Sequence, residues 1–225
     1  MQSKVWLVIP AYNEARVISP TLTDAKAYFS NIVVVDDHSS DATGDLALSA
    51  GAYVCRHPVN LGQGAALFTG IQFALLQGAE TIVTFDADGQ HSARDATAMV
   101  QVLHKENCDV VLASRFLGKA EGLSRRKRLF LQLATSYTRA TTQLAITDTH
   151  NGLRVFSRRA AEQIQIRQNR MAHASEILEQ IATLGLSYVE VPCTITYTDY
   201  SMAKGQHMSG AFTILTDLFM RRLYK

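Results

Sequence analysis

The chain has 225 residues, of which 47% are hydrophobic, and this is enough to bury the core of one α/β domain. Its formal net charge is +2, which gives no reason to expect a nucleic-acid partner. No apolar stretch reaches the roughly twenty residues that a membrane-spanning helix needs. The first residues, 1–4, lead straight into an apolar run and do not resemble a signal peptide. Three scattered cysteines lack the spacing of a zinc site and indicate buried thiols in a reducing compartment.

In chain order, apolar runs alternate with segments of helical spacing. Runs rich in β-branched residues, without polar alternation, predict strands covered on both faces, and these lie at 5–9, 32–35, 52–55, 81–86 and 109–113. The segments between them predict helices, at 14–29, 41–50, 64–76 and 95–105. This β-α-β alternation predicts an α/β fold with a Rossmann-like, mostly parallel central sheet and helices on both faces.

Acidic residues follow three of the predicted strands. Ligands of open parallel sheets bind beyond the carboxyl ends of the strands, so these acids predict a binding site: Glu14, Asp36, Asp37, Asp86 and Asp88. Asp86 and Asp88 are two positions apart, and such side chains point the same way if the backbone stays extended. The pair is therefore suited to a divalent cation such as Mg²⁺, which binds through one or two carboxylates together with substrate phosphates.

A glycine-containing segment, residues 60–64, precedes the third predicted helix. It does not match a dinucleotide-binding fingerprint, because that pattern requires glycine where Leu67 stands. Gly62 and Gly64 could let the backbone approach a phosphate or a neighbouring loop. The alternative is a tight loop that contacts no ligand.

Four motifs in order carry a resemblance to a known family: 8–14, 34–41, 60–64 and 86–91. Together they resemble the nucleotide-sugar-binding half of inverting glycosyltransferases of family 2. Further segments at 113–116, 148–154 and 197–204 are similar to the dolichol-phosphate mannosyltransferase-like branch, whose members glycosylate polyprenyl phosphates. The resemblance covers roughly residues 4–206. It implies one GT-A-type catalytic domain over 1–206, with a donor half at 1–115 and an acceptor half at 116–206.

The resemblance implies that four residues line the base and ribose of a UDP- or GDP-sugar: Pro10, Tyr12, Glu14 and Asp37. Asp86 and Asp88, with Gln90 beside them, would hold Mg²⁺ or Mn²⁺ against the diphosphate. The metal would act as a Lewis acid on the departing nucleoside diphosphate. Arg115, just past the fifth strand, would add a second positive charge there.

The acceptor is predicted from the cations of the second half. A phosphate monoester is anionic at neutral pH and needs cations to position it rather than a general base. Residues 125–128 open an amphipathic helix, and the predicted acceptor-phosphate residues are Arg128, Arg154 and Lys204. The alternative for this helix is a solvated face or attraction to anionic lipid. The branch often has an arginine shortly before Lys204, and this chain has Asp199-Tyr200-Ser201 there.

A second acceptor class stays open. If the acceptor is a hydroxyl of a growing cell-surface saccharide, Glu176 is the predicted catalytic base, with His150 and His173 as weaker candidates. Glu176 lies near the start of a predicted helix, where an acid also interacts favourably with the helix dipole. A non-catalytic nucleotide-sugar-binding subunit is the alternative of another class.

The C-terminal segment, 207–225, has apolar residues at helical spacing and three basic residues near its end. Such a helix can lie in a lipid interface. It predicts a cytoplasmic protein that is peripheral on the cytoplasmic face of the inner membrane. The alternative is a helix docked on the protein's own core or on a second subunit of a homodimer.

Overall fold

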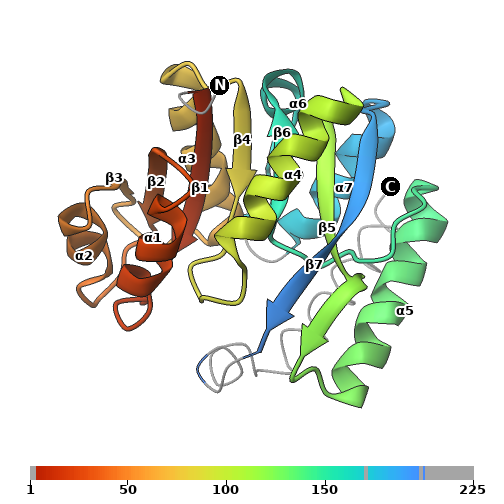
Figure 1. Cartoon of the computed structure of the whole chain (residues 1–225), viewed down its shortest axis with the longest axis horizontal. Coiled ribbons are helices and arrows are strands. Elements are labelled where there is room, and N and C mark those ends of the chain that lie inside the picture. The colour runs from red at the N-terminus through yellow and green to blue at the C-terminus, as the bar shows by residue number, and fades with distance from the viewer. Residues whose placement is uncertain (1–3, 170–171, 198–199, 201–225) are drawn as a thin grey trace.

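The computed structural model describes residues 4–169, 172–197 and 200. These residues form a seven-stranded sheet in the order β3-β2-β1-β4-β6-β5-β7, with helices packed on both faces (Figure 1). The strands are β1 Val5–Ala11, β2 Asn31–Asp36, β3 Tyr53–Arg56, β4 Thr81–Thr84, β5 Val110–Glu121, β6 Arg154–Ser157 and β7 Tyr188–Thr196. Only β6 runs antiparallel to its neighbours in this sheet. The predicted α/β class and mostly parallel sheet are confirmed.

The helices are α1 Ile18–Lys26, α2 Thr43–Ser49, α3 Gln63–Leu76, α4 Ala93–Glu106, α5 Arg125–Thr142, α6 Arg158–Gln163 and α7 His173–Thr183. Helix α1 is shorter than the predicted 14–29, because residues 14–17 form a turn in which the Val17 N–H donates to the Glu14 carbonyl. Pro20 then stands in the first turn, where its missing N–H removes no intrahelical bond.

Two hydrophobic clusters cover the opposite faces of the sheet. Alternation along β1 directs Leu7 and Ile9 toward α1 and α4, whereas Trp6 and Val8 face α3. All four side chains are buried, Leu7, Val8 and Ile9 completely. The sheet is therefore a rigid scaffold whose edge loops are free to carry polar groups.

The second half of the chain departs most from the sequence prediction. The pattern did not predict β6, α6 or β7, and β5 continues to Glu121 rather than ending at Ala113. Its pairing with β7 shifts register between Ser114 and Lys119. Gly118 lies so close to β7 that an added Cβ would be 2.1 Å from the Cys193 carbonyl oxygen. The irregular stretch that results carries Arg115 at the edge of the sheet.

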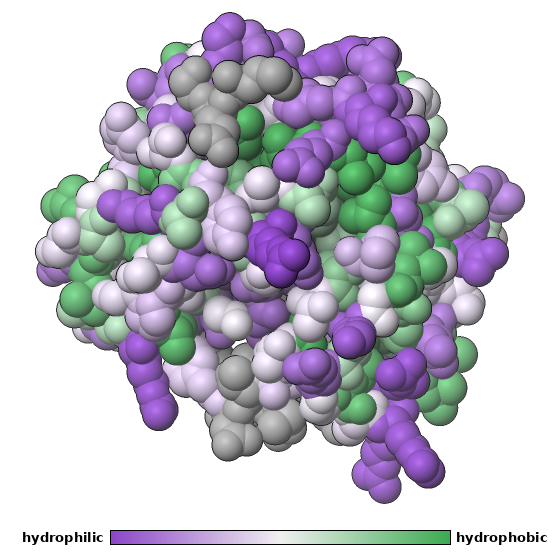
Figure 2. All heavy atoms as spheres, viewed as in Figure 1, coloured by the Kyte–Doolittle hydropathy of each residue, from purple (hydrophilic) through white to green (hydrophobic). Residues whose placement is uncertain are grey.

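No helix in the described part of the chain is long and apolar enough to cross a membrane. The tail helix predicted over 207–225 lies outside the described residues, as does Lys204. On the face that Figure 2 shows, hydrophilic side chains cover most of the surface, and hydrophobic ones gather near β7.

Candidate functional site

The site lies at the carboxyl edge of the sheet. Strands β1, β2 and β4 are parallel, and β5 has the same direction because β6 is antiparallel to both β4 and β5. The arrowheads of β4, β5 and β7 point to the same side of the molecule (Figure 1). The loops that follow β1, β2, β4 and β5 therefore meet along one edge, as the strand pattern predicted.

The loops after β1 and β2 are held together by hydrogen bonds between their polar residues. The Asn13 N–H donates to Ser39 Oγ over 2.9 Å, and the Ser40 N–H donates back to Asn13 Oδ1 over 2.8 Å. Asn13 has φ of 53°, a left-handed conformation that asparagine tolerates. Together these contacts fix the turn that begins the predicted donor pocket.

Three predicted donor residues lie on β1 and this turn. Pro10 is buried within the strand, whereas Tyr12 has 44% of its surface exposed. Glu14 is buried, its N–H donates to Thr43 Oγ1, and its Oε2 accepts a hydrogen bond from the Tyr200 hydroxyl over 2.7 Å. Of the three, Tyr12 is the most exposed residue.

Asp37, the fourth predicted donor residue, faces inward. Its carboxylate accepts the Leu61 N–H at 2.9 Å and the Gly62 N–H at 2.7 Å, and it pairs with His57 Nδ1 at 2.7 Å. The Asp37 side chain is 3% exposed. In this structure Asp37 therefore anchors the 57–62 loop rather than lining an open ribose pocket.

The glycine segment approaches protein rather than phosphate. An added Cβ on Gly64 would lie 1.9 Å from the carbonyl oxygen of Gln168, and the Gly64 N–H donates to the Asn169 carbonyl. The Gly62 N–H is taken by Asp37. The backbone N–H groups of Gly62 and Gly64 therefore both have protein acceptors and do not bind a phosphate in this structure. Of the alternatives that the sequence left open, the structure supports close approach of the backbone to a neighbouring loop.

Asp86 and Asp88 follow β4 and lie at the centre of the edge. Asp86 accepts hydrogen bonds from Gln63 Nε2 at 3.0 Å and from His91 Nε2 at 3.2 Å. Burial opposes ionisation of Asp86, but the His91 hydrogen bond and nearby positive charges outweigh burial, and the pKa of Asp86 is lowered. Asp86 is therefore the more easily ionised member of the pair.

Asp88 has the opposite environment. Burial, with a further contribution from the Asp86 carboxylate, raises the pKa of Asp88 to about 6. Its carboxylate accepts hydrogen bonds from Gln90, through both the N–H at 3.1 Å and the side-chain amide at 2.5 Å. Two close carboxylates that repel each other would be relieved by a divalent cation.

A glycine brings a distant motif against this pair. An added Cβ on Gly152 would lie 2.1 Å from Asp86 Oδ2. The 148–154 segment therefore packs directly on the Asp86 carboxylate, which joins the donor half to the acceptor half of the chain.

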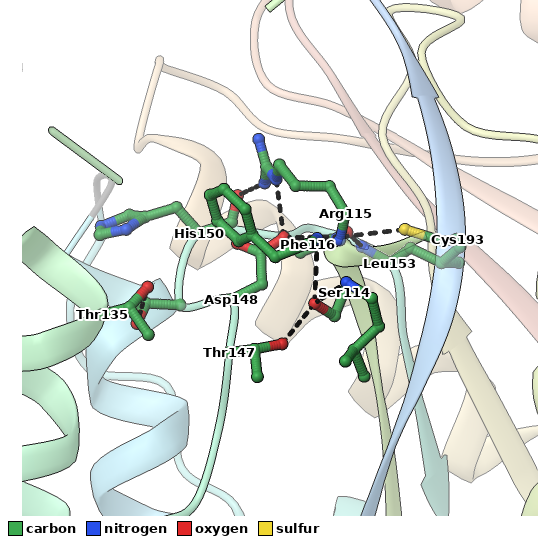
Figure 3. Close-up of polar contacts among 12 residues, drawn as sticks. Ser114, Arg115, Phe116, Thr135, Thr147, Asp148, His150, Leu153 and Cys193 are labelled. Atoms are coloured by element: carbon green, nitrogen blue, oxygen red, sulfur yellow. Dashed lines mark hydrogen bonds and ion pairs between the residues drawn. The ribbon is translucent and has the colours of Figure 1, made fainter. Parts of the chain in front are cut away.

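Arg115 is the centre of a buried polar cluster in β5, where its pairing with β7 shifts register (Figure 3). Its Nε donates to Asp148 Oδ2 over 2.6 Å, Nη1 donates to the Tyr197 hydroxyl over 2.5 Å, and Nη2 donates to the His150 carbonyl. Burial alone would lower the pKa of Arg115, but the Asp148 carboxylate outweighs it and raises that pKa. Arg115 is thus fixed in place and permanently charged.

His150 lies beside this cluster, and its ring is directed away from the Arg115 guanidinium (Figure 3). Both ring nitrogens are buried without a hydrogen-bond partner, and burial lowers the pKa of His150 to about 4. The imidazole is therefore neutral at physiological pH.

Of the predicted acceptor-phosphate residues, Arg128 and Arg154 lie in the described structure and Lys204 lies outside it. Arg154 is buried on β6, where Nη2 donates to the Thr149 and Ala174 carbonyls. Burial lowers the pKa of Arg154 to about 10 against the influence of Asp86 and Asp148. Arg154 is thus a buried countercharge to Asp86 and Asp148, and its role in binding the acceptor phosphate stays a prediction.

Arg128 is exposed on α5, with its guanidinium carbon 5.9 Å from the Phe116 ring centre. Its neighbour Lys127 extends instead toward the Arg115 cluster, with Nζ 4.5 Å from the Tyr197 ring centre. The 125–128 cation cluster was visible in the sequence, but which of its members faces the site depends on how α5 packs.

Glu176, the predicted alternative base, is buried in the first turn of α7. Its Oε2 accepts the N–H groups of Arg167 at 3.0 Å and Gln168 at 2.9 Å. Glu176 therefore holds the 165–169 loop, and this engagement does not fit a base that must approach an acceptor hydroxyl.

Comparisons with known proteins agree with this geometry. The model of the family described as glycosyl transferase family 2 matches residues 6–165. The chain is 37% identical to the uncharacterized protein MJ1222 of Methanocaldococcus jannaschii, covering 99% of this chain and 94% of that protein. It is 30% identical to UDP-N-acetylglucosamine–dolichyl-phosphate N-acetylglucosaminyltransferase of Methanococcus voltae, covering 98% and 97%.

Among solved structures, glucosyl-3-phosphoglycerate synthase from Mycobacterium tuberculosis, in complex with Mn²⁺, UDP and glucosyl-3-phosphoglycerate, has a similar fold. The TM-score is 0.75 at 18% sequence identity, over 97% of this chain and 79% of that one. The fold is therefore of the GT-A type, as the motifs implied.

Proposed function

This chain belongs to glycosyl transferase family 2, and we propose that it transfers a sugar from a UDP- or GDP-linked donor to a polyprenyl phosphate. It is a glycosyltransferase that depends on a nucleotide sugar. The observation that carries the proposal is the joint placement of two acids and two cations at one edge of the sheet. Asp86 and Asp88 follow β4, and Lys127 lies close enough to Asp88 and to Arg115 for both charges to act on its pKa.

The donor side rests on the acidic pair. In the described part of the chain, no group of three or more His, Cys, Asp or Glu residues is placed to hold a metal. Two carboxylates do fit a Mg²⁺ or Mn²⁺ ion whose other ligands are diphosphate oxygens and water. Bound between Asp86, Asp88 and the donor, the ion would neutralise charge on the diphosphate.

The proposed acceptor is argued from the positive charge of the site. A phosphate monoester needs positive charge to hold it and no base to deprotonate it. The site offers such charge around Arg115, whereas Glu176 is committed to two backbone N–H groups. The Methanococcus voltae relative, which the chain matches over nearly its full length, is named for transfer to dolichyl phosphate. These observations favour a polyprenyl phosphate over a saccharide hydroxyl.

The proposed chemistry is a single displacement with inversion. An acceptor phosphate oxygen forms a bond to the anomeric carbon of the sugar while the bond from that carbon to the donor phosphate oxygen breaks. The nucleoside diphosphate departs with the electron pair. Arg115, held rigid by Asp148 and Tyr197, is preorganised to stabilise negative charge without reorganising.

A lipid-linked acceptor also places the enzyme at a membrane surface. We propose peripheral contact through 207–225, whose apolar and basic residues suit an interface with anionic lipid. Sedimentation of the full chain with anionic vesicles tests this part. A protein that stays in the supernatant at low salt would contradict it.

The main experiment is a calorimetric donor panel of UDP- and GDP-sugars with Mn²⁺ or Mg²⁺. We expect one donor to bind in a metal-dependent way, Asp88→Ala to lose that binding, and the exposed control Asp45→Ala to keep it. Turnover with polyprenyl phosphate, followed as glycolipid product, then tests the acceptor. A wild type that binds no donor with either metal would overturn the proposal.

Glu176→Gln separates the two acceptor classes. For a polyprenyl phosphate we expect kcat to stay within a few-fold of wild type, because the amide oxygen still accepts from the 165–169 loop. For a hydroxyl acceptor, loss of the base would reduce kcat by roughly a hundredfold or more. A reduction of that size, with the thermal unfolding temperature unchanged, would favour the saccharide acceptor.

A further inference from the structure

The turn that follows β1 is held by two distant parts of the chain. From the loop between β2 and α2, Asp41 Oδ2 accepts the Ala15 N–H over 3.1 Å. Thr43 Oγ1 accepts the Glu14 N–H over 2.7 Å. These two bonds hold the backbone of the turn. The side chain of Glu14 is held from elsewhere, because its Oε2 accepts the Tyr200 hydroxyl over 2.7 Å, across 186 positions of the chain.

The Tyr200 hydroxyl is the donor in this contact. Burial, and then the hydrogen bond to Glu14, raise the pKa of Tyr200, so the hydroxyl keeps its proton at physiological pH. A hydroxyl that donates to a carboxylate forms a charge-assisted hydrogen bond, which is stronger than a bond between neutral groups. The contact therefore favours one orientation of the Glu14 carboxylate.

The ring of Tyr200 makes a second contact with the same turn. The guanidinium carbon of Arg16 lies 5.7 Å from the ring centre, in a cation–π arrangement. Arg16 is exposed, whereas Glu14 is 7% exposed. Arg16 thus holds the ring near the surface of the turn while the hydroxyl reaches the buried carboxylate.

The contact joins the two ends of the described chain at the site. Tyr197, three positions before Tyr200, accepts a hydrogen bond from Arg115 through its hydroxyl. Two tyrosines that follow β7 therefore contact two parts of the site, the Arg115 cluster and the turn after β1. The second of these parts carries Glu14, which is predicted to line the nucleotide.

We infer that Tyr200 is a positioning residue of the donor site, whose hydroxyl orients the Glu14 carboxylate to accept a hydrogen bond from a ribose hydroxyl of the nucleotide. The inference rests on the proposed function and deepens it. An ionised carboxylate has about four acceptor sites, so it can accept from Tyr200 and from a ribose hydroxyl together. A carboxylate held in one orientation before the donor binds loses less conformational entropy on binding.

The test compares Tyr200→Phe with Tyr188→Phe. Each variant removes one hydroxyl and keeps the ring, and Tyr200→Phe also keeps the ring that Arg16 contacts. The Tyr188 hydroxyl accepts the N–H of Ala145, an exposed residue at which water can replace it. Calorimetry with Mn²⁺ gives the Kd of UDP and of GDP, and then of the 2′-deoxy and 3′-deoxy forms of the nucleotide that wild type binds. Thermal unfolding checks that both variants are folded.

We expect Tyr200→Phe to raise the Kd of the ribonucleotide by roughly fivefold to twentyfold, and Tyr188→Phe to stay within twofold of wild type. One deoxy form lacks the hydroxyl that Glu14 binds. Its affinity should change much less in Tyr200→Phe, because the contact that Tyr200 prepares is already absent. An equal loss of affinity for the ribonucleotide and for both deoxy forms would mean general damage to the site and would overturn the inference.

Glu14→Ala gives a second measurement, because Tyr200 acts through Glu14. Adding Tyr200→Phe to Glu14→Ala should change the Kd of the ribonucleotide by less than about twofold. A second loss as large as that of Tyr200→Phe alone would show that Tyr200 acts independently of Glu14, which contradicts the inference.

Failure of the proposed function gives a different result. A wild type that binds neither UDP nor GDP refutes the proposed function and this inference together. A wild type that binds one of them, with the same Kd within twofold in Tyr200→Phe, overturns this inference alone.

Discussion

Several residues of this site hold neighbouring groups in position through close contacts between polar atoms. Gly152 lets the Asp86 carboxylate lie against the backbone of the 148–154 segment, where any side chain would overlap it. Asp37 and Glu176 each accept two backbone N–H groups and so hold loops. Several polar residues of the family motifs thus position their neighbours, and fewer are open to a ligand.

Gly152→Ala tests this packing. The new Cβ would lie 2.1 Å from Asp86 Oδ2, so we expect the carboxylate to be displaced and metal-dependent donor binding to weaken at least tenfold. Calorimetry measures the affinity. Gly185→Ala is the control, because a Cβ added there meets no atom within 4 Å. Its φ of 63° means that the alanine still costs some stability, but it does not disturb Asp86. Equal donor affinity of Gly152→Ala and wild type would refute the packing argument.

His150 predicts a pH dependence of stability. Its pKa falls from 6.5 to about 4 on folding. Above pH 6.5 neither state holds the proton, and below it the unfolded state takes the proton first, so stability is lost as the pH falls toward 4. At about pH 4.5 the loss due to His150 is on the order of 2 kcal/mol.

Urea unfolding at about pH 7 and about pH 4.5 measures this loss. We expect the free energy of unfolding of His150→Gln to fall less between the two conditions than that of wild type. Wild type and His150→Gln share all other titrating groups, so the difference in pH dependence between them is due to His150. Identical pH dependence would mean that the imidazole is solvated in the folded state.

At the level of elements, the site depends on how helices meet loops that follow distant strands. Helix α3 begins where the loop anchored by Asp37 ends, and its first turn packs on the 165–169 loop through Gly64. Glu176 holds the other side of that loop from α7. One loop thus joins α3 to α7 and connects the two halves of the chain.

Gly64→Ala should weaken the contact between the first turn of α3 and the 165–169 loop. Overlap at 1.9 Å with the Gln168 carbonyl oxygen cannot be relieved by a rotamer change, because both groups are part of the backbone or fixed to it. We expect a loss of roughly 2 kcal/mol or more in unfolding free energy, measured by urea titration. Gly78→Ala, just past the end of α3, meets no atom within 4 Å and bears only the cost of its φ of 82°, so it serves as the control for a Cβ added without overlap. A variant as stable as this control would show that the loop can move away at little cost.

For the molecule as a whole, the donor site joins loops from both halves, so ligand binding should stabilise the entire fold. A nucleoside diphosphate with Mn²⁺ at about one hundred times its Kd stabilises the folded state by about 2.7 kcal/mol. For a chain of this size that corresponds to a rise in Tm of roughly 5–10 °C. Differential scanning fluorimetry measures the shift.

Neither the nucleotide without metal nor Mn²⁺ alone should produce this shift. Asp88→Asn, which keeps the side-chain volume and removes the charge, should abolish it. A full shift in Asp88→Asn would mean that the nucleotide binds without the acidic pair.

The sequence by itself determined the class of fold and the edge that carries the site. Strands buried on both faces are continuous apolar runs, and the residues that follow them are polar because they face a ligand or a loop. The apolar pattern and the order of the motifs were therefore sufficient to predict both the class of fold and this edge. The five predicted strands of the first half are all present, and the family motifs lie at their carboxyl ends.

Only the tertiary structure decided which polar residues hold loops and which face the site. The partners of Asp37 include Leu61, 24 residues away, and those of Arg154 include Ala174, 20 residues away. Glu176 accepts from the loop that precedes α7, and which way that loop folds back is not visible in the spacing of the residues. The antiparallel β6 and the shifted pairing of β5 with β7 arise from contacts of the same long-range kind. Lys127 is distinguished from its basic neighbours only by the packing of α5, because a helix turns each successive side chain by about 100° and the sequence does not state which direction is inward.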